Sequence, residues 1–413
     1  MPGEGIDGSW SCDEMRRSPS APPLVVTVST TPARDVLDVW DALVERTPGT
    51  DVTQLSAWAR VRASAGFSSL HVLAHRGASL VGGAQLLCRR VPVVGRVGYA
   101  PYGPVVDPSV DDVDEVWDAI ADALRTLGRR QLRMLFVQPP EGADAVSADL
   151  IARGFRPSSA GIAPAGSIRI DLSDDLGQIR SRFGRRLRSW PHRWEGRGVT
   201  VSVGGARDLP LLARLLTQSA QRQGFTPPSL AYLETLYREL AAGGNVALFI
   251  GYVHGRPVAA DLVTVCGDMI RGRFAGFHRY GEAAQLSVPA AIRWEIIRWG
   301  QNRGLRWLDF GGLSDASLDA LLSSGGGSGG GGVGGGPAGA VAPCDQPKLT
   351  FGGTPYRYPP AVEMITPALL RVVYDLARAS QRGRRALHWV QVALRMRSVP
   401  RSHGRSRIAE DGV

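Results

Sequence analysis

Lysine is nearly absent from this chain of 413 residues. Lys348 is the only lysine, so 47 of the 48 basic residues are arginine. Arginine carries a flat, permanently charged fork, whereas lysine carries a compact point charge that can be placed close to a developing oxyanion. A lone lysine on a loop can be a chance survivor of a bias toward arginine. Its surroundings, residues 347–353 (PKLTFGG), make it instead the first candidate for chemistry.

Cysteine is scarce as well. The four cysteines contain no CxxC pair and form no ligand pattern with the histidines; they are Cys12, Cys88, Cys266 and Cys344. This spacing argues against a zinc site and against a disulfide framework. We therefore expect no metal and a reducing cytoplasm.

Long apolar runs are also missing. None reaches the roughly 18 residues of a membrane-spanning helix, and residues 1–23 lack the apolar segment of a signal peptide. We expect a cytoplasmic protein, with peripheral contact at the inner face of the plasma membrane. The net charge of +10 favours a polyanionic partner, which is nucleic acid, an anionic membrane surface or a phosphorylated substrate.

The composition changes along the chain and suggests four parts. Residues 1–23 are rich in Gly, Ser and Pro, which predicts a disordered N-terminus. Two domains are expected at 24–165 and 166–377, the second with a flexible Gly-rich insertion at 321–345. The tail, 378–413, carries nine Arg and no acid between Arg378 and Arg407.

The body of the chain repeats one order of elements. Each half reads as two strands joined by a turn, then a loop, a helix and a further strand. In the first half the helix has an apolar face from Val113 to Leu127 and is expected to end at Gly128. In the second half Ser287 is expected to be the N-cap and Pro289 lies in the first turn. The pattern predicts a mixed α/β fold with two acyltransferase domains of the GNAT type and a cleft between or beside them.

Short motifs in this order resemble the FemABX family of tRNA-dependent aminoacyltransferases, which are built from two GNAT-like domains. The resemblance covers most of residues 50–360. In the first half it rests on 54–62 (QLSAWARVR), 81–84 (VGGA) and 101–107 (PYGPVVD). In the second half it rests on 219–225 (SAQRQGF), 286–288 (LSV), 294–295 (WE), 308–312 (LDFGG) and 348–353 (KLTFGG).

The resemblance implies a set of site residues. The family's catalytic lysine falls on Lys348, and Asp107 is the second catalytic candidate, as proton acceptor or as the group that orients the incoming ammonium. The implied substrate-binding residues are Arg62, Tyr102, Arg222 and Phe351. The simpler alternatives are that Asp107 caps the following helix and that both arginines lie on solvated helix faces. Gln346 and Pro347 depart from the Arg-Phe that usually precedes the family's lysine.

The implied reaction is transfer of an amino acid from aminoacyl-tRNA to the stem-peptide amine of a peptidoglycan precursor, either nucleotide-linked or lipid-linked. Such an ester is already activated, so no cofactor is needed. The helix expected after the hairpin in each half does not start with the Arg/Gln-x-x-Gly-x-Gly/Ala motif that binds coenzyme A pyrophosphate. This absence argues against acetyl-coenzyme A as the donor.

Two basic tracts are candidates for the polyanionic partners. Residues 180–197 hold seven Arg and one Glu around an apolar stripe, which suggests contact with the tRNA backbone. The tail combines arginines with apolar residues, which suggests an anionic membrane.

Two other functions stay open from the sequence alone. One is a Fem-like N-acyltransferase that acts on another amine, such as a peptide natural product or an exopolysaccharide precursor. The other is a non-catalytic paralogue that binds RNA or a membrane.

Overall fold

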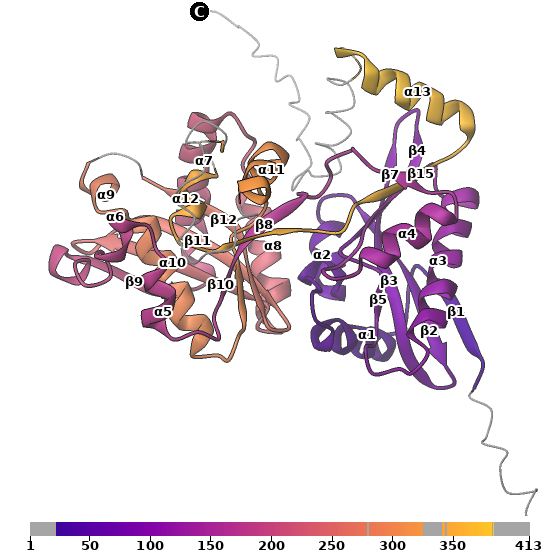
Figure 1. The fold of residues 1–413 in the computed structure, drawn as a ribbon, viewed down its shortest axis with the longest axis horizontal. Helices are drawn as coiled ribbons and strands as arrows, with labels where there is room; N and C mark the ends of the chain where they lie inside the picture. The colour runs from indigo at the N-terminus through magenta and orange to yellow at the C-terminus, as the bar shows by residue number, and fades with distance from the viewer. Residues whose placement is uncertain (1–21, 279–280, 325–340, 343–344, 382, 384–413) are drawn as a thin grey trace, which may run out of the picture.

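Two mixed sheets, each with helices packed against it, lie side by side (Figure 1). The computed structural model describes residues 22–278, 281–324, 341–342, 345–381 and 383. We call each sheet with its helices a unit. The expected mixed α/β class is confirmed. The expectations for residues 1–21, for most of the Gly-rich insertion and for the tail beyond Gly383 lie outside the described residues.

The first sheet has the strand order β1-β2-β3-β4-β6-β15-β7, with β5 paired to β3. Only the pairing of β4 with β6 is parallel. Its strands are β1 (Leu24–Ser29), β2 (Ser68–Arg76), β3 (Ser79–Val91), β4 (Gly95–Pro101), β5 (Val105–Val106), β6 (Met134–Gln138), β7 (Arg156–Pro157) and β15 (Val362–Ile365).

Helices cover both faces of the first sheet. They are α1 (Arg34–Arg46), α2 (Ser56–Ala63), α3 (Val113–Arg130) and α4 (Asp144–Ala152). The predicted apolar face of α3 is confirmed, since Val116, Ile120, Leu124 and Leu127 are buried. The expected helix end at Gly128 is wrong. The helix continues to Arg130, because Gly128 is a packing position where a Cβ would meet the Met364 sulfur at 2.8 Å.

The second sheet has the order β14-β8-β13-β12-β11-β10-β9, and only β12 and β13 are parallel neighbours. Its strands are β8 (Gly166–Asp171), β9 (Val199–Gly204), β10 (Val246–Val253), β11 (Arg256–Cys266), β12 (Met269–Phe277), β13 (Trp307–Asp309) and β14 (Thr354–Arg357). Its helices are α5 (Leu176–Ser181), α6 (Arg185–Arg188), α7 (Leu209–Gln223), α8 (Leu230–Ala241), α9 (Glu282–Gln285), α10 (Val288–Gln301), α11 (Asp315–Ser324) and α12 (Gln346–Leu349).

The start of α10 shows how far the capping signal holds. Ser287 is at the N-cap position and Pro289 is in the first turn, as predicted. Ser287 nevertheless has a left-handed backbone with φ of 52° and makes no side-chain cap bond. The helix start is therefore fixed by packing, and Val288 and Ile292 lie against Gly251 of β10.

One apolar core runs through both units. Trp40, Leu55 and Trp58 of the first unit belong to the same buried cluster as Leu215 and Leu236 of the second. The opposite face of the second sheet is covered by α10 and forms a separate core. The two units are thus joined by buried apolar surface as well as by the polar contacts described below.

The last described strand returns to the first unit. After Tyr358 the chain pairs β15 with β6, so residues 362–365 lie in the first sheet. Our linear division assigned them to the second domain. The helix α13 (Ala368–Ala379) follows on the outside of the first unit (Figure 1). Among the described helices, none combines the length and the apolar character required to cross a membrane.

The two glycines of the 81–84 motif let helices α1 and α3 pack closely on the two faces of the first sheet. Gly82 and Gly83 lie side by side on β3 and so face opposite sides of the sheet. A Cβ on Gly82 would meet Val116 of α3 at 3.0 Å, and one on Gly83 would meet the Val72 carbonyl oxygen at 2.3 Å and Trp40 of α1 at 3.0 Å.

We expect Gly83→Ala to destabilise the fold by about 1–3 kcal/mol, because the backbone of β2 cannot move away from the new methyl group. The matched control is Gly196→Ala, where no atom lies within 4 Å of the added Cβ. Urea unfolding of both variants checks this. Equal midpoints for the two variants would contradict the packing role of Gly83.

Candidate active site where the two units meet

Lys348 lies on the short helix α12 and is held by three oxygen acceptors. Its Nζ donates to the Asp345 carboxylate at 3.2 Å, to the Gly311 carbonyl at 3.5 Å and to the Gly312 carbonyl. The side chain is 23% exposed, whereas Asp345 is buried. The ammonium is therefore fixed in position but still reachable, and the Gly311 contact is the longest of the three.

Asp345 is held in its charged form. Burial raises its pKa, but the Ser314 amide, the Lys348 charge and the Ser314 and Ser317 hydroxyls outweigh this and lower it. The residue follows the Gly-rich segment in the sequence, and its contacts with Ser314 tie the lysine helix to the chain just after β13.

The turn that holds Lys348 is anchored on Asp309 at the end of β13. Asp309 Oδ1 accepts from the Gly311 amide at 2.7 Å and from the Ser167 hydroxyl. The Ser167 hydroxyl oxygen also lies 2.9 Å from the Gly311 carbonyl oxygen. Gly311 has φ of +84°, which favours glycine. One buried carboxylate thus fixes the carbonyl oxygens that receive the lysine.

The other oxygen of Asp309 faces Tyr358, whose hydroxyl donates to Oδ2 at 2.5 Å. The Tyr358 ring meets Tyr102 edge-on at 5.4 Å, and the Arg271 guanidinium lies 4.7 Å from the Tyr102 ring centroid. Burial raises the pKa of Tyr102 to about 12, so its hydroxyl stays protonated at neutral pH. Asp309 at the end of β13 therefore connects Tyr102, through Tyr358, with Lys348, through Gly311.

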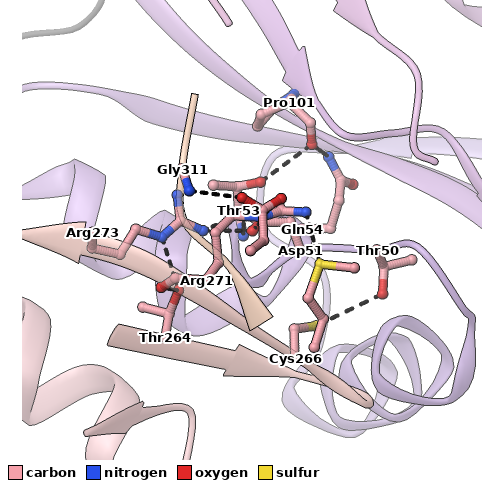
Figure 2. A network of polar contacts seen from close by, with 12 residues as sticks. Thr50, Asp51, Thr53, Gln54, Pro101, Thr264, Cys266, Arg271, Arg273 and Gly311 are labelled. Carbon is pink, nitrogen blue, oxygen red and sulfur yellow. Dashed lines mark hydrogen bonds and ion pairs between the residues drawn. The ribbon is translucent and has the colours of Figure 1, made fainter. Parts of the chain in front are cut away.

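An ion pair between the units completes this arrangement (Figure 2). Asp51 of the first unit lies between two arginines of β12, with Arg271 Nη1 at 2.5 Å and Arg273 Nη2 at 2.5 Å from Oδ2. Burial alone would raise the pKa of Asp51, but the two guanidinium groups outweigh it and hold the pKa well below its usual range. The strand bulges at Arg273, since the register passes from Leu262–Phe274 to Val263–Gly272.

A second ion pair joins the units on the other side of Asp309. Arg169 of β8 bonds Glu141 of the first unit, and its guanidinium stacks on Tyr356 with a centroid distance of 3.8 Å. Arg169 is buried, and its Nε and Nη2 have no hydrogen-bond partner among the described atoms. The Nε lies 3.7 Å from Asp309 Oδ2, so Arg169 also pairs with the carboxylate that anchors the lysine turn.

The other predicted site residues lie at three further places. Asp107 accepts from Arg46 at 2.6 Å and from the amide and hydroxyl of Ser109. Burial raises the pKa of Asp107, but these bonds outweigh it and lower the pKa. The helix-capping alternative is wrong, because Asp112 and not Asp107 is at the N-cap position of α3. Asp107 instead closes the turn to Ser109, and its oxygens are already occupied as acceptors.

Arg62 is buried on α2, with its guanidinium 4.1 Å from the Phe67 ring centroid. Arg222 is at the end of α7 and donates to the Phe277 carbonyl at 3.1 Å, while its buried Nε has no hydrogen-bond partner among the described atoms. Phe351 is buried against Phe183 and Phe310, so it packs the loop beside Lys348. Of the predicted site residues, Lys348 contacts the Asp309 network through Gly311, and Tyr102 contacts it through Tyr358.

Sequence reasoning missed Asp51, Arg169, Arg271 and Arg273 as parts of the site. One signal was available in the sequence. Residues 271–273 (RGR) place two arginines two positions apart in an apolar surrounding, which is typical of a strand with a buried charged face.

A separate buried pair lies next to Phe310. Asp261 of β11 contacts Arg293 of α10 at 2.8 Å, and Arg293 lies 5.4 Å from the Phe310 ring centroid. Burial raises the pKa of Asp261 to about 6, although the Arg293 charge acts in the opposite direction. Asp261 Oδ1 and Arg293 Nη1 have no hydrogen-bond partner among the described atoms.

Comparison with known proteins agrees with this architecture. A family model described as "Acetyltransferase (GNAT) domain" matches residues 177–317. A lipid II:glycine glycyltransferase of Staphylococcus aureus is 28% identical over 230 residues, which are 51% of this chain and 52% of that protein. The Staphylococcus saprophyticus protein of the same name is 29% identical over 235 residues, 54% of this chain and 56% of its own.

The crystal structure of FemX superposes with a TM-score of 0.67 at 16% identity, and the superposition covers 85% of this chain and 99% of FemX. The resemblance to the FemABX family is confirmed. The two-unit GNAT-like fold is shared along almost the whole of FemX. The chain spans about half the length of the curated relatives that it matches in sequence.

We expect Asp51→Asn to lower the free energy of unfolding at pH 7 by about 3 kcal/mol, because it removes the carboxylate partner of Arg273 and leaves buried Arg271 with Asp309 alone. The control is Asp319→Asn, which removes an exposed partner of Arg357 and should cost at most about 1 kcal/mol. Urea denaturation at fixed salt measures both. A loss for Asp51→Asn no larger than the control's would show that the pair does not stabilise the junction.

Asp261 makes a prediction about pH. Its folded pKa is raised from 3.8 to about 6, so its contribution to stability is full below pH 3.8 and is lost as the pH rises through 6. The stability of the wild type relative to Asp261→Asn should therefore fall by about 2 kcal/mol between pH 4 and pH 7. Denaturation of both proteins across this range tests it, and a constant difference would show that Asp261 ionises normally.

Proposed function

We propose that this protein transfers an amino acid from aminoacyl-tRNA to an amine on the stem peptide of a peptidoglycan precursor. The observation that carries the proposal is the placement of Lys348, the only lysine of the chain. It is held on Gly311 and Gly312, within the segment that matches the acetyltransferase family model. The names of the glycyltransferase relatives support a cell-wall acceptor.

The reaction requires little chemistry from the protein itself. The acceptor amine attacks the ester carbonyl carbon, a C–N bond forms, and the C–O bond to the tRNA ribose breaks. The amine loses a proton, and the ribose oxygen gains one as it leaves. The carbonyl oxygen carries negative charge in the tetrahedral intermediate, and a nearby fixed cation stabilises that charge. Lys348 is this cation in our proposal.

The contacts of Lys348 suggest how it reaches the substrate. An ammonium has three protons, and here all three meet oxygen atoms. The contact with the Gly311 carbonyl is at the limit of hydrogen bonding, at 3.5 Å. A substrate oxyanion replaces this contact, while Asp345 and Gly312 keep the ammonium in position.

Asp107 has a smaller role in this proposal than the family resemblance implies. A carboxylate with a lowered pKa and an arginine partner is a weak proton acceptor. We assign Asp107 the positioning of the loop after Tyr102, through Ser109. The amine can lose its proton to water or to the substrate itself.

The acceptor and donor would be bound through arginine. Arg62 and Arg222 are candidates for the phosphates or carboxylates of the precursor, because a guanidinium binds such groups in a bidentate manner. For tRNA, the supporting feature is the tract 180–197. Phe183, Leu187 and Trp194 are buried there, and Arg185, Arg186, Arg188 and Arg193 are exposed.

We expect Lys348→Met to lower turnover by about a hundredfold or more, because the oxyanion loses its cation. The substitution also removes the ion pair with Asp345, so the stability of the variant is measured alongside its turnover. Lys348→Arg should recover part of this at most, since the larger fork does not fit the same point. The assay combines the purified protein, charged tRNA and a muramyl-pentapeptide precursor, and the product mass is measured. Asp319→Asn is the control for surface change.

Near wild-type turnover for Lys348→Met would remove the lysine from the mechanism. Wild-type protein that adds no mass to any muramyl-pentapeptide acceptor in the presence of charged tRNA would contradict the proposed function as a whole.

A further inference from the structure

The helix α13 exposes an apolar stripe that no described part of the chain covers. Leu369, Val372, Val373 and Leu376 are between 53% and 74% exposed. Their spacing places them on a single face of the helix. Scattered exposed apolar residues are normal on a protein surface, but four within two turns of one helix mark an interaction site.

The opposite face of α13 fixes the direction of this stripe. Arg371 pairs with the buried Glu363 of β15 at 2.7 Å, and Tyr374 is buried and 3.5 Å from the same carboxylate. Asp375, the one acidic residue of α13, is paired with Arg371. The helix is therefore held against the first sheet through this face, and the exposed stripe lies on the opposite face.

A second exposed apolar group lies at the same end of the first unit. Val93, at the turn between β3 and β4, has a relative exposure of 108% and φ of 67°. The Val94 amide bonds the Pro92 carbonyl across it at 2.8 Å, which makes a γ-turn of the rare and strained type. A β-branched residue is unfavourable at a positive φ, so the turn keeps an exposed valine in a strained backbone conformation.

Backbone contacts connect this turn to the start of α13. The Arg133 amide bonds the Arg96 carbonyl at 2.8 Å, and the Thr366 amide bonds the Arg133 carbonyl at 2.9 Å. Thr366 lies two residues before the helix. The turn, the end of α3 and the beginning of α13 thus belong to one end of the molecule.

Arginines surround these apolar groups. Arg90 beside the turn and Arg129, Arg130 and Arg133 at the end of α3 are all exposed. The sequence continues from α13 into the tail with Arg382, Arg384 and Arg385 and no acid until Glu410. We use "basic apolar face" for the stripe of α13, Val93 and the four exposed arginines.

We propose that the basic apolar face docks the protein on an anionic phospholipid bilayer. An apolar helix face with flanking arginines lies at the boundary of headgroups and acyl chains, and arginines near an anionic surface add to the binding. A second copy of the chain would bring the same arginines together, and the tail carries the same sign of charge. Both are therefore poorer occupants than an anionic surface.

The inference goes beyond the proposed transfer reaction and does not depend on it, because docking is measured without substrate. Full-length protein is mixed with vesicles of phosphatidylcholine and phosphatidylglycerol, or of phosphatidylcholine alone, and the bound fraction is read after sedimentation. We expect binding to the mixed vesicles only, and weaker binding as salt is raised.

Two matched pairs of variants locate the docking surface. Leu369→Gln with Leu376→Gln should lower the partition coefficient about tenfold or more, because two large apolar side chains no longer enter the bilayer. The control, Val39→Gln with Val203→Gln, removes exposed apolar groups elsewhere and should bind like the wild type. Arg129→Gln with Arg130→Gln should lower the partition coefficient about fivefold for each arginine. Arg185→Gln with Arg186→Gln gives the same net charge but should lower the partition coefficient less.

Three results would overturn the inference. The first is unchanged vesicle binding by the Leu369/Leu376 variant while its thermal unfolding matches the wild type. The second is loss of binding only when residues 384–413 are removed, which would assign docking to the tail alone. The third is a wild-type dimer that becomes a monomer in the stripe variant, with no vesicle binding in either protein.

Discussion

The carboxylate of Asp51 between Arg271 and Arg273 is the contact on which the arrangement of the two units depends. Asp51 is also the N-cap of the short turn Val52–Gln54, where its Oδ1 accepts from the Thr53 amide. Gln54 at the end of that turn donates to the Pro101 carbonyl at 2.6 Å, just before Tyr102. One residue therefore sets the loop that carries Tyr102 and also holds the strand β12 of the other unit.

The same network extends to the lysine. Arg271 lies between Asp51 and Asp309, and Asp309 orders the Gly311 turn on which Lys348 rests. A buried charge is stable only when it has a partner of opposite charge, so removing one carboxylate leaves a buried arginine without full compensation. Because every charge at the junction needs its partner, the two units cannot easily move apart. A rigid junction in turn holds the proposed catalytic cation in place.

Much of the fold could be predicted from the sequence, because the repeated order of strands and helices is a local pattern. The apolar face of α3 and the strands around each hairpin were readable from their periodicity. The family motifs located Lys348 and Tyr102. The split role of 180–197, with an inner apolar stripe and outer arginines, also followed from spacing alone.

The rest depended on contacts between distant residues. Asp51 and Arg271 are 220 positions apart, and no local pattern pairs them. The bulge at Arg273 depends on the register of two strands, and β15 reaches the first sheet only because the chain crosses the junction a second time. Asp107 had the residue type of a base, but its partner Arg46 lies 61 positions earlier. Residue type without geometry could not decide its role.

Hydrogen exchange measured by mass spectrometry, on the wild type and on Asp51→Asn, tests the central claim most directly. If the ion pair joins the units and supports the lysine turn, exchange should become faster on both sides, in residues 51–55, in β12 and in residues 309–312. Strand β1, which is far from the junction along the first sheet, should be unchanged. Faster exchange confined to residues 51–55, with β12 and the turn at 309–312 unaffected, would contradict the account.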